Sequence, residues 1–289
     1  MAELDEVQDE RRHLLNLAFR MLGTFADAED AVQETYIRWY RLSDAERDAI
    51  ESPRGWLTRV ASRVCLDVLG SARARREHYV GEWLPEPVPV ASGDGRDPLD
   101  RVSLDESVST ALLIVLDSLT PAERVSYVLH EVFAVPFAEI AEIVGRTPAA
   151  CRQLATSARR HIKERRPQPA ARERHDALVK AFIAACTTGD LVALATVLDP
   201  DVVLRSDGGG FVSAARKPVF GADNVSRFIF GIMSKQPSLE VTQRESADGL
   251  SLAFWREGRI GGVLTFRVAN ESIADVWIMM NPEKLSLWH

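Results

Sequence analysis

The chain has 289 residues, enough for two or three domains, and its 46% hydrophobic and 27% charged residues are typical of a soluble globular protein. No apolar run reaches the length of a membrane span, and the acidic start MAELDEVQDERR excludes a secretory signal peptide, so we expect a cytoplasmic protein without membrane contact. The net charge of −7 is uneven, because residues 54–78 hold six Lys or Arg against two Asp or Glu and residues 146–171 hold seven against one, which favours local phosphate binding.

Cysteine and histidine spacing predicts neither a disulfide framework nor a metal site. Cys65, Cys151 and Cys186 lie far apart and form no CxxC pair, and the six histidines form no HExxH motif. We expect small buried thiols in a reducing compartment, no bound metal and no cofactor.

Two amphipathic helices are expected first, over residues 6–22 and from Asp27 to Arg41, with Thr24 as the cap of the second. Carboxylates are favoured near the positive N-terminal end of a helix. The acidic side of the second helix is therefore either a solvated face or a docking face for a basic partner.

A third helix is expected over residues 52–77, because Ser52-Pro53 is a start signal and apolar residues follow at helical spacing. Trp56 stands among arginines, and aromatic side chains beside cations are what single-stranded bases require. Arginines at the end of a helix also complement its dipole, and this explains about two of them.

Residues 79–106 are rich in proline and glycine, which predicts a partly extended linker. The linker contains the apolar motif WLPEP, Trp83 to Pro87. Such a Trp and Leu favour burial, so we expect the motif to dock elsewhere in the molecule. Helices resume over residues 107–120 and again after Thr120-Pro121.

Residues 136–166 predict a helix-turn-helix. A short amphipathic helix is followed by Gly145, where a tight turn is allowed, and then by Thr147-Pro148, which suits the start of a second helix. The second helix is polar and basic, as in helices that enter the DNA major groove. A helical hairpin within an ordinary bundle is the alternative.

Residues 172–289 predict an α+β domain. Helices are expected over 172–187, 191–198 and 224–234, and a run of short strands indicates an antiparallel sheet. The expected strands cover residues 201–205, 211–214, 240–244, 251–256, 261–268 and 272–280. Phe211, Phe254, Trp255, Phe266, Trp277 and Met279 either line a pocket or form the core, and core is favoured for most of them.

The motifs DAEDAVQETYIRWYR, SPRGWLTRVASRVCLDVLGSARARRE and LTPAERVSYVLHEVFAVPFAEIAEIVGRTPAACRQ resemble the second and fourth conserved regions of extracytoplasmic-function sigma factors. Residues 172–289 resemble a SnoaL-like domain of the NTF2-like superfamily. The resemblance implies two all-α domains and a C-terminal α+β cone with a curved antiparallel sheet. The expected boundaries are 1–78 for region 2, 79–106 for the linker, 107–166 for region 4 and 167–289 for the SnoaL-like domain.

The resemblance also implies roles for particular residues. A group on the acidic helix would bind core RNA polymerase: Asp27, Asp30, Gln33 and Glu34. A second group would lie along the promoter minus-10 element: Trp56, Arg59, Arg63, Arg73, Arg75 and Arg76. A third group would read the minus-35 element in the major groove: Arg152, Gln153, Thr156, Arg159 and Arg160.

Three positions depart from the family pattern. Arg63 stands where the family usually has Asn, and Leu154 and Ser157 stand where relatives often carry Arg. Leu154 and Ser157 remove two potential phosphate contacts from the second helix of the helix-turn-helix. We therefore expect its affinity for the minus-35 element to be weaker, or more dependent on polymerase.

The linker and the C-terminal domain share motifs with the sigma factors that carry this extension. The residues expected to form a regulatory contact are Trp83, Leu84, Pro85, Asp207, Gly208, Gly209, Gly210, Asn281, Pro282 and Lys284. The hypothesis is that WLPEP packs near Asp207–Gly210 and Asn281–Leu285. The C-terminal domain would then regulate the sigma factor in cis, in place of a separate anti-sigma protein.

The expected partners are core RNA polymerase, through its β′ and β subunits, and promoter DNA. Homodimerisation through the C-terminal domain stays open. A stand-alone helix-turn-helix regulator with a ligand-sensing domain is the second hypothesis, but it leaves the acidic helix and the first basic segment unexplained. A cyclase or isomerase is the third, but His175 and His289 at the two ends of the domain make no convincing acid–base pair, so we expect no catalysis.

Overall fold

The computed structural model describes residues 10–76, 79–90, 108–165, 170–236 and 239–288, and the side chains of residues 72–76 lie outside the description. The described chain forms two compact units. One unit holds the N-terminal helices together with residues 112–165. The other holds residues 79–90 and 108–111 together with the C-terminal domain.

The N-terminal helices form a small bundle in which α2, α3 and α5 pack against one another. They cover Arg11–Leu22, Phe25–Tyr40 and Pro53–Arg76, and the short helix α4 covers Asp44–Asp48. Thr24 caps α3 through its hydroxyl, which accepts from the Asp27 amide. Helix α2 is buried from Leu14 to Leu22, so it forms the centre of this bundle.

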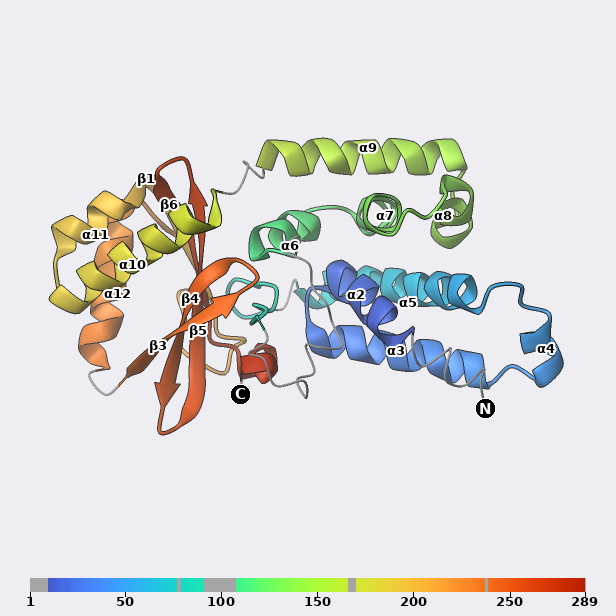
Figure 1. Ribbon diagram of the computed structural model, residues 1–289, viewed down its shortest axis with the longest axis horizontal. Coiled ribbons are helices and arrows are strands. Elements are labelled where there is room, and N and C mark those ends of the chain that lie inside the picture. The colour runs from blue at the N-terminus through green and yellow to red at the C-terminus, as the bar shows by residue number, and fades with distance from the viewer. Residues whose placement is uncertain (1–9, 77–78, 91–107, 166–169, 237–238, 289) are drawn as a thin grey trace. The chain divides into compact units, whose positions relative to one another are not determined.

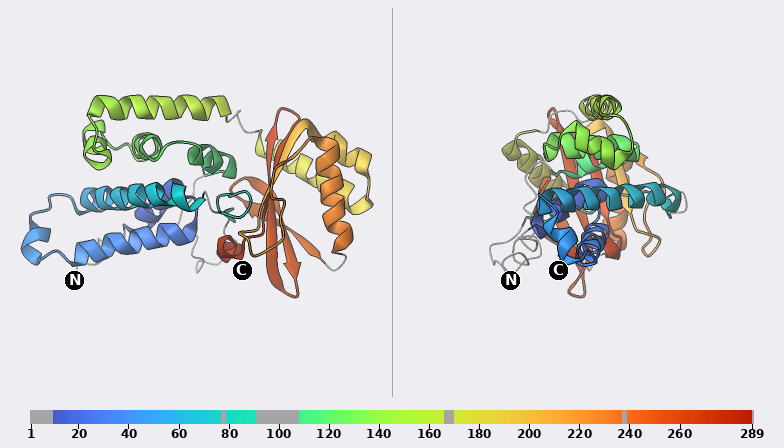
Figure 2. Two further views of the ribbon diagram at one scale, coloured as in Figure 1. Left: turned by 180° about the vertical axis from the view of Figure 1, so that it is seen from behind. Right: turned by 90° about the vertical axis from the view of Figure 1, so that its right-hand side faces the viewer.

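The second group of helices contains the helix-turn-helix. It comprises α6 (Thr110–Asp117), α7 (Pro121–Tyr127), a π-helical turn (Val128–Val132), α8 (Phe137–Val144) and α9 (Pro148–Arg165). Helices α7 and α8 pack on α9, the long helix in yellow-green (Figure 2). Arg124 ties α7 to the bundle, because its buried guanidinium donates to the Met21 carbonyl at 2.7 Å and pairs with Asp117 at 2.8 Å.

The C-terminal domain is a mixed sheet with helices on one face. Its helices are α10 (Arg172–Thr188), α11 (Leu191–Val197) and α12 (Ala222–Lys235). Its strands are β1 (Leu198–Asp207), β2 (Val219–Phe220), β3 (Glu240–Ser246), β4 (Gly249–Arg256), β5 (Arg259–Ala269) and β6 (Ser272–Met279). The helices cover one face of the sheet, and the teal segment 79–90 lies on the other side with the C-terminal turns (Figure 1).

The sheet differs from expectation in one respect. The strand order in the described residues is β2-β1-β6-β5-β4-β3, and β1 runs parallel to β6 while the other neighbours are antiparallel. The expectation of a wholly antiparallel sheet was therefore wrong at this pair. The connection explains this pairing, because β2 and α12 follow β1 and the chain re-enters the sheet as β3, at the edge opposite β2. The antiparallel strands β3, β4, β5 and β6 then lead back across the sheet to β1.

The strand expected at residues 211–214 is a turn. The amides of Phe211 and Val212 both donate to the Gly208 carbonyl, at 3.0 and 3.1 Å. Gly209 and Gly210 have φ of 61° and 80°, a left-handed conformation that glycine adopts without steric cost. The three glycines therefore reverse the chain directly after β1. The next strand is the two-residue β2, which pairs antiparallel with β1.

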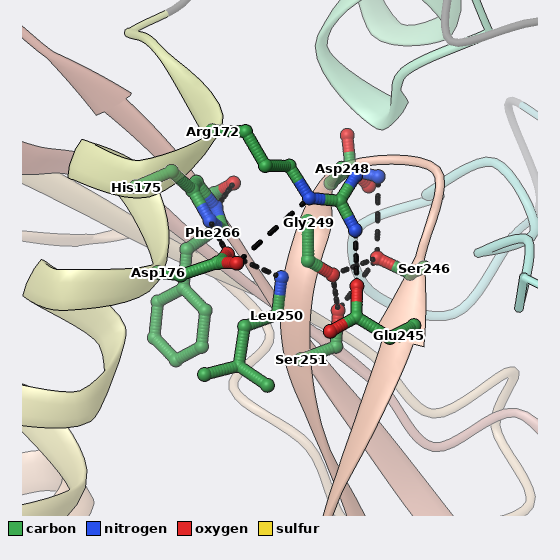
Figure 3. Close-up of polar contacts among 10 residues, drawn as sticks. All are labelled: Arg172, His175, Asp176, Glu245, Ser246, Asp248, Gly249, Leu250, Ser251 and Phe266. Carbon is green, nitrogen blue, oxygen red and sulfur yellow. Dashed lines mark hydrogen bonds and ion pairs between the residues drawn. The ribbon is translucent and has the colours of Figure 1, made fainter.

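Helix α10 is fixed to the β3–β4 hairpin by polar side chains, drawn in Figure 3. Asp176 accepts from the Leu250 amide at 3.0 Å and lies 3.0 Å from His175 Nδ1. Burial opposes the charged form of Asp176, but these hydrogen bonds and nearby Arg172 outweigh it and lower the pKa of this carboxyl. His175 Nε2 donates to the Phe266 carbonyl at 3.3 Å.

Gly249 is required at this contact. Its φ is 118°, and a Cβ atom there would lie 2.4 Å from His175 Nδ1. Gly249→Ala is therefore expected to lower the free energy of unfolding by about 2–4 kcal/mol, through backbone strain and steric overlap together.

The measurement is urea unfolding followed by circular dichroism. The matched control is Gly231→Ala within α12, where a Cβ meets nothing within 4 Å and alanine favours the helix. Equal unfolding midpoints for the two variants would contradict this account of the hairpin.

Candidate functional site

The expected polymerase-binding residues form part of an exposed stripe along α3. Asp30 and Gln33 are exposed, and Glu34 pairs with Arg38 at 2.8 Å one turn away. Asp27 is half-buried and accepts from the Thr24 hydroxyl at 2.5 Å, so it stabilises the helix start. The other three side chains remain directed to solvent on the polar side of α3.

Two apolar side chains extend this stripe and were not singled out from the sequence. Ile37 is 38% exposed and Tyr40 is 46% exposed, both on the continuation of the acidic face. Residues three and four apart lie on the same helix face, so Asp30, Gln33, Ile37 and Tyr40 are neighbours. Exposed apolar groups beside carboxylates are typical of a protein-binding surface.

The expected minus-10 residues are carried by α5. Trp56 is half-buried and meets Trp39 edge to face at 5.2 Å between ring centroids. Arg59 lies 3.6 Å from Glu142 Oε2, and Arg63 donates to the Glu142 backbone carbonyl at 3.1 Å. Both arginines are therefore engaged by α8 in this structure.

Arg73, Arg75 and Arg76 lie in the last turn of α5, and their side chains are outside the described residues. The described part of the helix therefore places Trp56, Arg59 and Arg63 at positions separated by three and four residues. That spacing puts all three on one face of α5.

The helix-turn-helix has the local geometry expected from its residues. Gly145 ends α8 with φ of 70°, and its amide donates to the Ala141 carbonyl. The Thr147 hydroxyl accepts from the Ala150 amide at 3.2 Å and so caps α9. Cys151, Ala155, Ala158 and Ile162 form the buried side of α9, which leaves the opposite side in solvent.

The expected minus-35 residues are all exposed on α9. Arg152 lies over the Phe137 ring at 5.2 Å from its centroid, and the Thr156 hydroxyl donates to the Arg152 carbonyl. Arg159 pairs with Glu131, and this hydrogen bond raises the pKa of its guanidinium. Gln153 and Arg160 project from the same exposed side of the helix.

Ser157, at one of the positions expected to depart from the family pattern, has a structural role. Its hydroxyl donates to Glu123 Oε1 at 2.9 Å, while Glu123 also forms a capping box with Thr120 at the start of α7. Burial opposes ionisation of Glu123, but its hydrogen bonds lower the pKa of this carboxyl overall. Ser157 therefore joins α9 to the cap of α7.

The expected regulatory residues meet around a buried carboxylate at the end of β1. Asp207 is fully buried, and Lys284 Nζ lies 2.8 Å from its Oδ2. The same oxygen accepts from the Leu84 amide at 2.9 Å, and the Tyr79 hydroxyl donates to Oδ1 at 2.6 Å. We call these residues, with Trp83, the linker dock.

Lys284 completes the linker dock from the C-terminal end of the chain. Its ammonium donates to the Leu84 carbonyl at 2.7 Å and lies 4.2 Å from the centroid of the Trp83 ring. Leu84, Pro85, Glu86 and Pro87 are buried, whereas Pro282 is exposed at the start of a 3-10 turn (Pro282–Lys284).

The glycines after Asp207 allow close approach to Asn281. The Gly209 amide donates to Asp207 Oδ1 at 2.9 Å, and a Cβ on Gly209 would lie 2.5 Å from the Asn281 side chain. A Cβ on Gly208 would lie 2.3 Å from the Val212 carbonyl, and Gly210 is exposed and faces Val80. Asn281 donates in turn to the Tyr79 hydroxyl at 3.0 Å.

Several members of this site were not identified from the sequence. Burial and the bond to Asp207 raise the pKa of Tyr79, so its hydroxyl stays protonated and donates. Trp288 Nε1 donates to the Pro87 carbonyl at 2.8 Å. Tyr79 precedes the motif WLPEP, and Trp288 follows the motif NPEKL (Asn281–Leu285). An aromatic residue close to each motif was the sequence signal that could have identified them as members of the site.

The hairpin between β3 and β4 makes a second contact with the linker. The Val90 amide donates to the Glu245 carbonyl and the Ala247 amide to the Val88 carbonyl, both at 2.9 Å. Asp248 accepts from the Thr110 amide at 2.8 Å and from its hydroxyl at 2.5 Å. Asp248 thereby caps the first residue of α6. This cap could not be predicted from the sequence, because Asp248 and Thr110 lie far apart in the chain.

The described residues offer no metal-binding group of three or more His, Cys, Asp or Glu side chains. Among the described helices, none has the length and apolarity needed to cross a membrane.

Comparisons with known proteins agree with the motifs. The family model of sigma-70 region 2 matches residues 7–76, and that of sigma-70 region 4 matches residues 109–162. The chain is 38% identical to ECF RNA polymerase sigma factor SigJ of Mycobacterium tuberculosis, over 98% of this chain and 93% of that protein. It is 40% identical to the probable ECF RNA polymerase sigma factor SigI of the same organism, over 95% and 92%.

A solved structure leads to the same family. The crystal structure of the Mycobacterium tuberculosis extracytoplasmic function sigma factor SigJ aligns with a TM-score of 0.76 and 34% identity, covering 99% of this chain and 98% of that one. Similarity of this extent includes the C-terminal domain as well as the two helical regions. The chain therefore belongs to the extracytoplasmic-function RNA polymerase sigma factors.

Proposed function

We propose that this sigma factor binds core RNA polymerase through the exposed stripe of α3, contacts the minus-10 element through α5 and the minus-35 element through α9, and is regulated in cis by its C-terminal domain. The cytoplasm is its place of action. The observation that carries the regulatory part is the anchoring of the linker at two points, in the linker dock and at the β3–β4 hairpin, where Asp248 also caps α6.

Both linker anchors favour regulation by a fused domain. The described linker residues 79–90, and residues 108–111 that follow the linker, belong to the same compact unit as the C-terminal domain. The linker connects the two promoter-binding regions, so its anchoring limits the separation that they can reach. A separate anti-sigma protein is then not required for restraint. Residues 84–88 occupy one side of the sheet, which disfavours homodimerisation through that side.

The burial of the candidate acid and base residues favours a protein that is not an enzyme. The described histidine of the C-terminal domain, His175, is 6% exposed and is used to fix α10. An acid or base must reach substrate to catalyse proton transfer. Asp207 is likewise buried and paired, so neither group is available for catalysis.

Charge reversal on the α3 stripe tests polymerase binding. Asp30→Lys combined with Gln33→Lys places two cations on the face proposed to meet a basic partner, so the affinity for core RNA polymerase should fall at least about tenfold. The measurement is fluorescence anisotropy of labelled protein titrated with core polymerase. Glu173→Lys, an exposed change on α10, is the control, and equal affinities for the two variants would contradict the proposed face.

Substitution of Gln153 tests promoter reading by α9. A well-placed amide–adenine pair contributes about 1–3 kcal/mol of discrimination, so Gln153→Ala should relax base preference at one position of the upstream element. The measurement is selection of promoters from a randomised library with the polymerase holoenzyme. Lys180→Ala is the control on α10. An unchanged selected sequence would exclude direct reading by Gln153.

Release of the linker tests regulation in cis. Lys284→Met leaves Asp207 buried without its cation, at a cost of about 3–5 kcal/mol, and Trp83→Ala removes the ring beside that cation. Asp248→Ala removes the cap of α6, worth about 1 kcal/mol. We expect all three to shift promoter output severalfold in one direction, Lys284→Met most strongly, in run-off transcription with core polymerase.

Controls separate this effect from general damage. Lys180→Met carries the same chemical change at an exposed site of α10 and should leave output unchanged. Truncations before Asn281 and before Arg172 remove the dock and the whole domain. Unchanged output in the point variants and both truncations would refute regulation in cis.

A further inference from the structure

The C-terminal domain contains a cavity of about 370 Å³ between its helices and the sheet. Buried apolar side chains of α10, α12, β4, β5 and β6 form its inner wall, among them Phe182, Ile229, Leu252, Leu264 and Ile278. Its volume lies within the range of small-molecule sites. At roughly 30 Å³ for a water-sized group, it holds about a dozen non-hydrogen atoms.

Polar groups gather at the rim of this cavity. Arg256, Gln243, Ser213 and Thr187 line it and are exposed, with half-buried Gln236 beside them. Arg256 donates to Gln236 Oε1 at 2.8 Å, and this bond orients the guanidinium at the rim. Sites with an apolar interior and few placed polar groups bind ligands with one polar end.

The residues that line the cavity disfavour acid–base catalysis and favour the binding of a ligand. Among the described lining residues, the ionisable groups are the Arg256 guanidinium and the Cys186 thiol, with no carboxylate, imidazole or amine. Burial raises the pKa of Cys186 to about 12, so this thiol stays protonated and acts as an apolar wall. Arg256 therefore supplies the charge of the lining.

We propose that this cavity binds an apolar carboxylate of about a dozen non-hydrogen atoms, with its hydrocarbon body inside and its carboxylate at Arg256. A guanidinium matches a carboxylate through two parallel hydrogen bonds, which an alcohol of the same length does not provide. The hydrocarbon body replaces water against the inner wall.

The site is connected to the linker dock, and this part of the proposal rests on the proposed regulation in cis. Val212, Ser213 and Met280 line the cavity. The Met280 amide donates to the Asp207 carbonyl at 2.7 Å, and residues 212 and 213 follow the glycine turn that begins at Asp207. A bound molecule that orders these segments slows opening of the linker dock.

The binding test uses the full chain and two probes of equal chain length. Sodium decanoate and decan-1-ol each compete with 1-anilinonaphthalene-8-sulfonate, whose fluorescence reports apolar sites. Decanoate should displace the dye at saturable, micromolar concentrations. Arg256→Gln should weaken decanoate at least about tenfold and leave decanol unchanged, while Arg259→Gln, an exposed arginine outside the cavity lining, changes neither.

Ile232→Trp fills the cavity from α12 and should abolish binding of both probes. If circular dichroism shows that Ile232→Trp does not fold, Val241→Trp replaces it. Val241 lines the cavity from the exposed end of β3, so a Trp there should also abolish binding of both probes without changing the core. Binding that survives in a folded cavity-filling variant, or decanoate binding that is unaffected by Arg256→Gln, would overturn the proposed site.

Hydrogen exchange tests the connection separately from transcription. The amides of residues 79–90 should exchange more slowly with saturating decanoate than with buffer, and Ile232→Trp should remove the difference. Unchanged or faster exchange despite binding would overturn the connection. Because neither measurement involves polymerase, failure here is distinguishable from failure of regulation in cis.

Discussion

The buried pair of Asp207 and Lys284 holds together three segments that are distant in sequence. A buried ion pair persists only where geometry is good and the remaining donors and acceptors are satisfied, because desolvation of each charge costs several kcal/mol. Here the Leu84 amide, the Tyr79 hydroxyl and the Gly209 amide satisfy the carboxylate, and the Leu84 carbonyl satisfies the ammonium. Removal of the linker would take away the Tyr79 hydroxyl and the Leu84 amide from the carboxylate and the Leu84 carbonyl from the ammonium, so these bonds are expected to break together.

The same pair explains why glycine follows Asp207. The carboxylate can accept from the Gly209 amide only if the chain turns back at once, with positive φ at Gly209. The Asn281 side chain occupies the space that a Cβ atom on Gly209 would need, and it donates a hydrogen bond to the Tyr79 hydroxyl. The motifs DGGG (Asp207–Gly210), WLPEP and NPEKL therefore form one site. Each motif supplies hydrogen-bond partners or space that the other two require.

Much of the fold followed from local signals. Caps at Thr24, Thr120 and Thr147 and the turn at Gly145 predicted helix boundaries, because these residues act on their own neighbours. Helix α4 was missed although Ser43 and Glu46 form a capping box within its short sequence. The parallel pairing of β1 with β6 and the cap of α6 by Asp248 were not predictable, since both join residues far apart in the chain. Residues 211–214 read as a strand by their composition, but the preceding glycines made them a turn.

The β3–β4 hairpin gives the linker anchors a common support. Pro89 in the linker forms a β-bridge with Ser246, and Asp248 binds Thr110 at the start of α6, so both segments are held within a few residues of one turn. Ser246 in turn accepts from the Asp248 amide and is hydrogen-bonded to Ser251 at 2.6 Å. Two anchors on one rigid turn are not independent, because distortion of the turn loosens both. Loss of this turn would therefore remove both of these contacts together, while Tyr79 and Leu84 stay bound to Asp207 and Lys284 in the linker dock.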